Sequence, residues 1–120
     1  MDDYKLGIVE SRFAEIIWKH EPLHSRELVA LCQQELNWKK PTTYTVLRKL
    51  CERGIFQNVG GTISSLLSRQ EFYARQSEQF VEETFDGSLP AFFAAFTTRK
   101  TLSAKEVEEI RRMIDRYGEG

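Results

Sequence analysis

Hydrophobic residues near the start of the chain recur with the period of an α-helix. Positions i, i+3, i+4 and i+7 of one helical face are occupied by Phe13, Ile16, Ile17 and His20. This spacing predicts a helix from about Val9 to His20 with one buried face.

A second helix is predicted after a short break. Pro22 ends the first helix because proline cannot continue it, and either His24 or Ser25 can cap the next one. If His24 is the cap, Glu27 is placed to reach back to the His24 backbone. The helical pattern then runs to about Leu36. The residues expected on its buried side are Leu28, Leu31 and Cys32.

A third helix is predicted from about Pro41 to Arg53, because proline suits the first turn and Gly54 suits the C-terminal stop. At 100° per residue, three apolar residues share one face of this helix: Val46, Leu47 and Leu50. The opposite side and its flanks carry a mainly basic and hydroxylic set: Thr42, Tyr44, Thr45, Arg48, Lys49 and Glu52.

Two β-prone runs follow in "IFQNVGGTISSLLS", separated by Gly60 and Gly61. Both glycines accept positive φ, which predicts a two-residue hairpin turn. Three helices followed by a hairpin are typical of a winged helix, in which the second and third helices form a helix-turn-helix. The expected fold class is mainly α: a winged helix-turn-helix DNA-binding domain in residues 1–68, then a C-terminal helical dimerisation region in residues 69–120.

The C-terminal region is predicted to contain three helices. Ser68 and Glu71 form a capping box for the first, which Gly87 ends. Ser88 can cap the strongly apolar segment "LPAFFAAF" that follows, and "SAKE" from Ser103 is the capping box of the last helix.

The apolar faces of these C-terminal helices need a partner, because the winged-helix domain already has a core of its own. A second copy of the chain supplies one, so we expect a homodimer. The residues expected at its interface are Tyr73, Phe80, Phe92, Phe93, Phe96, Val107, Ile110, Ile114 and Tyr117.

Charge is unevenly distributed along the chain. The formal net charge of the 120 residues is −1, yet residues 39–53 contain five basic side chains and one acidic side chain. A helix in the DNA major groove needs cations for phosphates, short hydroxyls, and side chains that reach base edges. The third helix has all three, which predicts binding to double-stranded DNA. The expected contact residues are Lys39, Lys40, Thr42, Thr43, Tyr44, Thr45, Arg48 and Lys49.

Other kinds of chemistry are not indicated. His20 and His24 are four residues apart, but Pro22 between them prevents a helical metal-binding pair. Cys32 and Cys51 lack the spacing of a zinc or redox motif. We therefore expect no enzyme activity, metal or cofactor. The absence of a long apolar run and of a signal-like N-terminus predicts a cytoplasmic protein without membrane insertion.

Two alternatives to DNA binding through a simple dimer stay open at this stage. The hairpin region from Gly54 to Ser68 has no charged residue, which also suits a winged helix that binds another protein. The aromatic set of Tyr73, Phe92, Phe93 and Phe96 also suits the pocket of a small-molecule-sensing repressor.

Three segments together resemble the penicillinase repressor family (BlaI, MecI and CopY types) of bacterial winged-helix repressors. They are "ESRFAEIIWKHEPLHSRELV", "KKPTTYTVLRKLCERG" and "SLPAFFAAFTTRKTLSAKEVEEIRRMID", which are similar to the first two helices, the recognition helix and the dimerisation region. The resemblance implies a homodimeric repressor on a two-fold symmetric operator, with contacts at positions matched by Thr42, Tyr44, Thr45 and Arg48.

The resemblance also bears on how repression ends. Members that answer β-lactams are cleaved after an Asn that precedes a Phe, through a membrane metalloprotease sensor. The matching pair here is Ala95-Phe96, so cleavage at this pair is not expected. Copper-responsive members have a cysteine-rich tail, whereas this sequence ends in "RRMIDRYGEG", so copper sensing by that route is not expected either.

Overall fold

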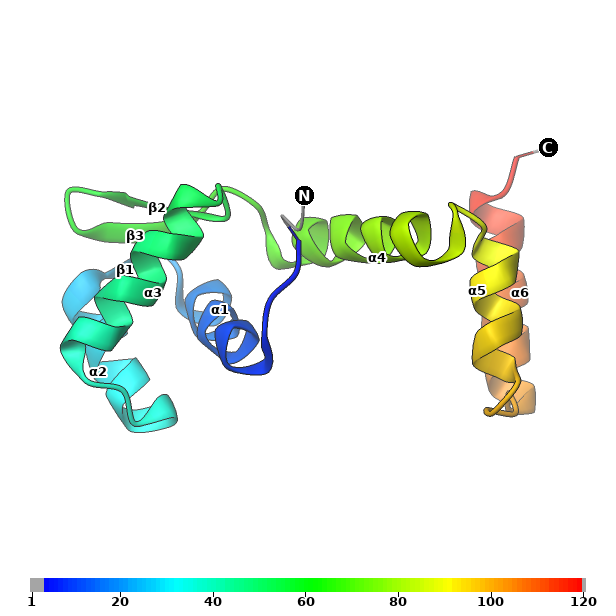
Figure 1. The fold of residues 1–120 in the computed structure, drawn as a ribbon, viewed down its shortest axis with the longest axis horizontal. Helices are drawn as coiled ribbons and strands as arrows, with labels where there is room; N and C mark the ends of the chain where they lie inside the picture. Colours follow the sequence, from blue (N-terminus) through cyan, green and yellow to red (C-terminus); the bar gives the residue numbers. More distant parts are fainter. Residues whose placement is uncertain (1–3, 120) are drawn as a thin grey trace. The chain divides into compact units, whose positions relative to one another are not determined.

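The computed structural model describes residues 4–119 and divides into two compact units, one ending at Gln79 and one beginning at Phe80. It is mainly helical with a three-stranded antiparallel sheet, as the sequence predicted (Figure 1). In chain order the elements are α1 (Ile8–His20), β1 (Leu23–His24), α2 (Ser25–Leu36), α3 (Lys40–Glu52), β2 (Phe56–Val59), β3 (Thr62–Ser65), α4 (Arg69–Phe85), α5 (Leu89–Thr97) and α6 (Ala104–Tyr117).

The first three helices begin and end within one residue of their predicted bounds. His24 is the N-cap of α2, and its Nδ1 accepts a hydrogen bond from the backbone N–H of Arg26 at 3.1 Å. The His24 N–H donates to Glu27 Oε1, also at 3.1 Å, which confirms the predicted reach of Glu27. These bonds satisfy backbone groups that a helix start leaves unpaired.

A tight turn between α2 and α3 fixes the direction of α3. Asn37 adopts the left-handed conformation with φ of 57°, which asparagine tolerates better than most residues. The next residue, Trp38, stacks on Phe13 of α1 with ring centroids 5.5 Å apart. The turn is therefore held by α1, so α3 cannot swing freely.

The core of the first unit lies where α1, α2 and α3 meet one face of the sheet. It holds Phe13, Ile17, Leu28, Cys32, Leu47, Leu50, Ile55, Phe56, Ile63 and Phe72. At about 25 cal/mol per Å² of buried apolar area, this cluster is the main source of stability for the unit.

The hairpin between β2 and β3 forms as predicted. Gly60 and Gly61 have φ of 60° and 91°, which a two-residue turn with positive φ at both positions requires. The strand β1 was not predicted. Leu23 pairs with Ile63 of β3, so the strand order is β1-β3-β2. A strand of two residues is too short to show alternating apolar and polar positions in the sequence. Its pairing with a distant strand defines it.

The start of α4 belongs to the first unit. Phe72 is fully buried in its core, and Gln76 donates to the backbone oxygen of Tyr4 at 2.8 Å. The unit therefore extends to Gln79, past the expected boundary after residue 68. The sequence indicated helix α4. The pattern of apolar residues in α4 does not show that its first turns pack against α1.

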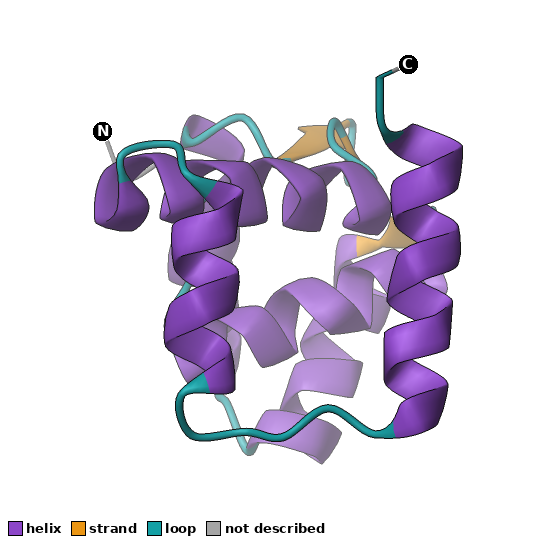
Figure 2. Cartoon of the chain, turned by 90° about the vertical axis from the view of Figure 1, so that its right-hand side faces the viewer, coloured by secondary structure: helices purple, strands orange, loops and turns teal. Residues whose placement is uncertain are grey.

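The second unit contains the end of α4 with α5 and α6. Figure 2 shows α5 and α6 as two upright helices joined by residues 98–103. Ser88 caps α5 and Ser103 caps α6, as predicted. Neither helix has a fully buried residue. The rings of Phe80, Phe85 and Phe92 meet where α4 turns into α5, with centroids 5.7 to 6.1 Å apart.

Within residues 4–119, no helix has both the length and the apolar character that crossing a membrane requires.

Candidate nucleic-acid interface

The helix α3 has one buried face and one exposed face. Leu47 and Leu50 are buried as predicted, and Val46 is partly buried. Thr43 is also buried, with no exposed surface, and its hydroxyl donates a long 3.5 Å hydrogen bond to the Lys39 backbone oxygen.

The expectation that Thr43 contacts DNA is therefore wrong. Thr43 lies four residues before Leu47, so its side chain points to the same core-facing side of the helix. There it lies beside the thiol of Cys32 on α2. The position of Thr43 in the N-terminal turn of α3 suggested a DNA contact. Its angular position on the helix instead directs the side chain into the contact between α2 and α3.

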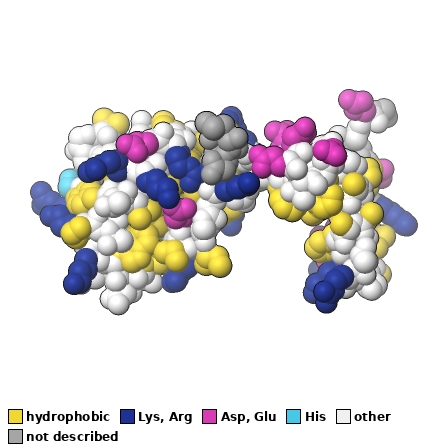
Figure 3. All heavy atoms as spheres, in the orientation of Figure 1, with side chains coloured by type: hydrophobic (Ala, Val, Ile, Leu, Met, Phe, Trp, Pro, Cys, Tyr) yellow, Lys and Arg dark blue, Asp and Glu magenta, His cyan; other side chains and the backbone are white. Residues whose placement is uncertain are grey.

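The exposed side of α3 carries cations and hydroxyls. Lys39, Lys40, Thr42, Thr45 and Arg48 are all exposed. Among the described residues, Lys39, Lys40 and Arg48 form no ion pair. Figure 3 shows Lys and Arg side chains at many places over the unit that carries α3. At least three cations per chain are thus available to a polyanion.

Tyr44 lies at the edge of this surface and is half-buried. Its ring packs against the first unit's core, and the Lys40 ammonium lies 6.0 Å from the ring centroid. A cation over an aromatic face is attracted by the ring's negative quadrupole. Tyr44 therefore attracts the Lys40 ammonium at the start of α3.

The hydroxyl of Thr45 is already used as a donor. Thr45 Oγ1 lies 2.9 Å from the backbone oxygen of Pro41, one turn earlier in α3. In this rotamer the hydroxyl keeps only acceptor capacity toward solvent, and the side-chain methyl remains available. Such a side chain matches the amino groups of adenine or cytosine, or the methyl group of thymine.

Lys49 is partly committed within the protein. Its ammonium forms an ion pair with Glu10 of α1, with Nζ 2.9 Å from Oε2, although 60% of the Lys49 side chain stays exposed. The hydrogen bond from Lys49 holds the pKa of the Glu10 carboxyl below its ordinary value. Glu10 was not among the predicted site residues. The two residues are far apart in sequence, and only the packing of α1 against α3 brings them together.

The hairpin is tied to the helix-turn-helix by backbone bonds. Gly61 accepts a hydrogen bond from the Ser25 N–H at 2.8 Å, and the Gly61 N–H donates to Asn58 Oδ1 at 2.9 Å. Val59 at the tip is well exposed. The hairpin offers backbone, hydroxyl and apolar groups to a partner, because no charged residue occurs between Gly54 and Ser68.

The two cysteines are both free thiols. Burial raises the pKa of the Cys32 thiol to about 11, and burial also raises the pKa of Cys51. High thiol pKa values disfavour the reactive thiolate. Within the part of the chain that the structure describes, no cluster of three or more His, Cys, Asp or Glu residues is suited to a metal ion.

The expected interface residues divide between the two units. Tyr73 lies in the first, where its hydroxyl donates to Glu15 Oε2 of α1 at 2.8 Å. Because its hydroxyl is bound to Glu15 and its ring packs on Trp18, Tyr73 lies apart from the other residues expected at a dimer interface. The remaining expected residues lie in the second unit: Phe80, Phe92, Phe93, Phe96, Val107, Ile110, Ile114 and Tyr117.

Much of this second-unit set is exposed in a single chain. Phe96 is 49% exposed, Ile114 is 63% exposed and Tyr117 is 76% exposed. Figure 3 shows hydrophobic side chains on the visible face of this unit. On α6 the set recurs at i, i+3, i+7 and i+10 from Val107, which is one continuous stripe. A stripe of this kind marks a surface that another protein surface covers.

Comparison with known proteins agrees with this architecture. A family model described as penicillinase repressor matches residues 6–116. The methicillin resistance regulatory protein MecI of Staphylococcus aureus (strain Mu50 / ATCC 700699) is 21% identical over 117 residues, which cover 94% of this chain and 95% of that protein. The penicillinase repressor of Bacillus licheniformis is 20% identical over 117 residues, which cover 94% of this chain and 91% of that protein. The chain belongs to the penicillinase repressor family, whose members are transcriptional repressors.

Proposed function

We propose that this protein is a homodimeric repressor that binds a two-fold symmetric operator by placing one copy of α3 in each of two successive major grooves. The observation that carries the proposal is the exposed side of α3, where Lys39, Lys40, Thr42, Thr45 and Arg48 face away from the core. Recognition helices of helix-turn-helix dimers lie about 34 to 36 Å apart on DNA, one helical turn.

The free cations set the expected salt dependence. If Lys39, Lys40 and Arg48 of each chain neutralise one phosphate, the dimer contacts six. The logarithm of affinity should then fall with the logarithm of salt concentration at a slope of about −5. Lys49 is left out of this count because Glu10 already neutralises it.

The apolar stripe of α6 supports the dimer. Val107, Ile110, Ile114 and Tyr117 lie on one side of a helix that has no fully buried residue in the single chain. A second copy carries the same stripe, so the two surfaces are complementary by symmetry. Dimerisation also provides two α3 helices, which bind one duplex more tightly than a single helix does.

A mobility-shift assay tests the DNA-binding part. Duplexes would be the promoter of the chain's own operon and sites selected from a random library. We expect the wild type to prefer these over unrelated duplexes, and Arg48→Ala to weaken binding to every duplex. Lys105→Ala removes the same charge from α6 and serves as the control. A salt slope near zero would rule out α3 as the contact surface.

Sedimentation tests the dimer. Ile110→Asp should yield monomers, because it puts a charge at a contact that dimerisation buries. Arg112→Asp introduces the same group on the opposite side of α6 and should leave the dimer intact. If the Ile110→Asp protein sediments as a dimer, the interface lies elsewhere.

The uncharged hairpin favours one alternative function, binding to another protein instead of DNA. The same mobility-shift assay separates the two, because a protein-binding winged helix would show no preference among duplexes.

A membrane metalloprotease is an alternative partner for ending repression, implied by the family resemblance. Ala95 and Phe96 are exposed, but both lie within α5, where the Phe96 oxygen accepts from the Lys100 N–H at 3.3 Å. A protease needs extended backbone, so α5 must unwind before cleavage. Intact protein recovered from derepressed cells would exclude this route, whereas a fragment starting at Phe96 would support it.

A further inference from the structure

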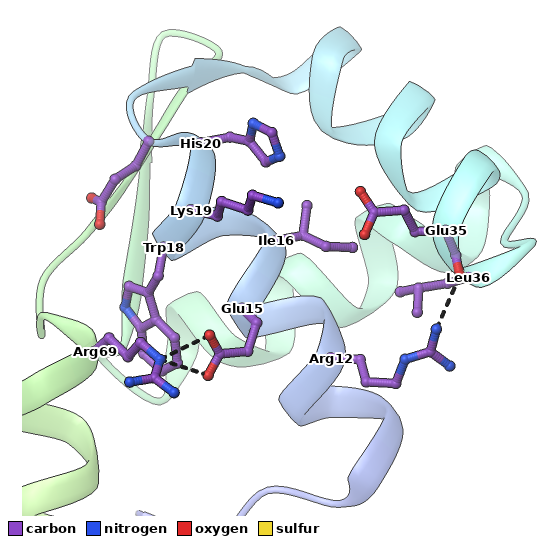
Figure 4. A pocket seen from close by; sticks show the side chains of 10 residues that line it. Arg12, Glu15, Ile16, Trp18, Lys19, His20, Glu35, Leu36 and Arg69 are labelled. Carbon is purple, nitrogen blue, oxygen red and sulfur yellow. Dashed lines mark hydrogen bonds and ion pairs between the residues drawn. The ribbon is translucent and has the colours of Figure 1, made fainter.

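The start of α4 is fastened to α1 by a cluster of polar contacts around Glu15. Arg69 Nε donates to both carboxylate oxygens of Glu15, at 2.8 and 2.9 Å (Figure 4). The Tyr73 hydroxyl donates to Oε2 of the same carboxylate at 2.8 Å. The Arg69 guanidinium also lies 5.0 Å from the centre of the Tyr73 ring. One carboxylate on α1 thus holds two successive turns of α4.

Trp18, one turn after Glu15 on α1, supports the same attachment. Its indole Nε1 donates to the backbone oxygen of Leu67 at 3.0 Å, just before α4 begins. The Trp18 ring packs against the rings of Phe72 and Tyr73, with centroids 5.5 and 5.8 Å away. The contacts are therefore apolar on one side of Tyr73 and charged on the other.

The chain between the sheet and α4 leaves little freedom of its own. Only residues 66–68 separate β3 from α4, and Ser68 Oγ caps α4 by accepting from the Glu71 N–H at 3.0 Å. Burial and the hydrogen bond to Glu15 raise the pKa of the Tyr73 phenol, so this hydroxyl stays a donor. The side chains of Arg69 and Glu15 are 61% and 40% exposed, so we expect the core to fold without this ion pair.

We propose that Glu15 is a positioning residue, which fixes the direction in which α4 leaves the winged-helix unit through Arg69 and Tyr73. The effect on DNA binding rests on the proposed function. The helix α4 continues into the second unit, which carries the proposed dimer interface. For the proposed dimer, we expect a fixed start of α4 to narrow the range of half-site separations that the dimer accepts. A loose α4 lets the two α3 helices adapt to several separations.

The first test measures affinity against half-site spacing. Inserting two base pairs between half-sites adds about 7 Å and roughly 70° of rotation. We expect this insertion to weaken wild-type binding at least about tenfold and Glu15→Ala binding only about twofold to threefold, with single half-site affinity unchanged in both. The loss of affinity for the Tyr73→Phe protein should lie between the losses of the wild type and of the Glu15→Ala protein. Glu35→Ala removes an exposed carboxylate that lines the same pocket but lies apart from Glu15 and Arg69 (Figure 4), and it should match the wild type.

If Glu15 contributes only to the stability of the fold, Glu15→Ala would lower the DNA affinity equally at all half-site spacings. That result would overturn the proposal. A wild type that tolerates the insertion as well as the Glu15→Ala protein would also overturn it.

The second test needs no DNA, so it separates this inference from the proposed function. Spin labels at Gln34→Cys on α2 and Glu78→Cys on α4, with Cys32→Ala and Cys51→Ser, report the distance between the two helices. We expect one narrow distance distribution that broadens when Glu15→Ala is added. If the distribution stays equally narrow, Glu15 does not position α4. The distribution could broaden in a protein that binds no duplex in the mobility-shift assay. In that case the positioning role of Glu15 stands and the proposed function fails.

Discussion

Lys49 of α3 and Glu10 of α1 form an ion pair, with Lys49 Nζ 2.9 Å from Glu10 Oε2. The pair joins the basic helix α3 to α1, and it places a carboxylate beside Lys49 on that helix. The pair therefore subtracts from the positive charge that α3 presents, and under the proposed function we expect Glu10 to limit DNA affinity.

Replacing Glu10 with Gln should tighten DNA binding. Lys49 would be free for a phosphate and a negative charge would be lost, so the salt slope of the dimer should steepen by up to about 2. Titrations of mobility shift against salt measure this. Glu35→Gln removes a carboxylate from another part of the unit and should change little. The gain should vanish in the double variant Glu10→Gln/Lys49→Ala, and a persistent gain would mean that Lys49 is not the cause.

The same pair predicts a pH dependence of stability. The pKa of Glu10 is lowered in the folded protein, mainly by the hydrogen bond with Lys49, so its ionised form favours folding. This contribution is present above the unfolded pKa of about 4.3 and is lost as pH falls through the lower folded pKa. The stability advantage of the wild type over Glu10→Gln should therefore shrink as the pH falls below about 5 and through the lowered folded pKa of Glu10. Urea unfolding at each pH measures it, and the trend should be smaller in a Lys49→Met background, where the Gly7 N–H still donates to Glu10.

Thr43 and Thr45 should respond oppositely to alanine substitution. Thr43 is buried beside Cys32, so Thr43→Ala should lower the free energy of unfolding by about 1 to 2 kcal/mol and leave operator preference unchanged. Thr45 is exposed, so Thr45→Ala should leave stability nearly unchanged and reduce the ratio of selected to random duplex affinity. Thermal melts and competition binding separate the two effects. The reverse pattern would mean that α3 is rotated from the orientation described.

The cysteines should differ in reactivity. With a pKa of about 11 for Cys32, only about one thiol in a thousand is ionised at pH 8, and its side chain is fully buried. Cys51 is partly exposed and should react with a thiol reagent first. One thiol should therefore react in the folded protein and two in denaturant. Fast reaction of both thiols without denaturant would contradict the packing of Cys32 between α2 and α3.

The helices and the hairpin could be predicted from the sequence because the interactions that start and end them involve residues close together in the chain. The capping groups His24 with Glu27, and Ser103 with Glu106, act within three residues of the backbone they satisfy. The two glycines of the hairpin act through their own backbone angles. For this reason the order of helices, the hairpin and the basic character of α3 followed from the sequence alone.

Features that depend on contacts between distant residues did not follow. The strand β1 exists because Leu23 pairs with Ile63, and the first unit extends into α4 because Phe72 fills its core. The predicted DNA contact of Thr43 failed because a basic, hydroxylic run does not by itself show which members face inward.

The sequence by itself determined which segments become helices, where they are capped and that positive charge gathers on one of them, since these depend on residue type and on neighbours a few positions away. Only the tertiary structure decided that Glu10 neutralises Lys49, that Glu15 holds Arg69 and Tyr73, and that Thr43 is buried. The physical reason is that these relationships arise between surfaces of packed helices, and no spacing within a single segment encodes which surfaces meet.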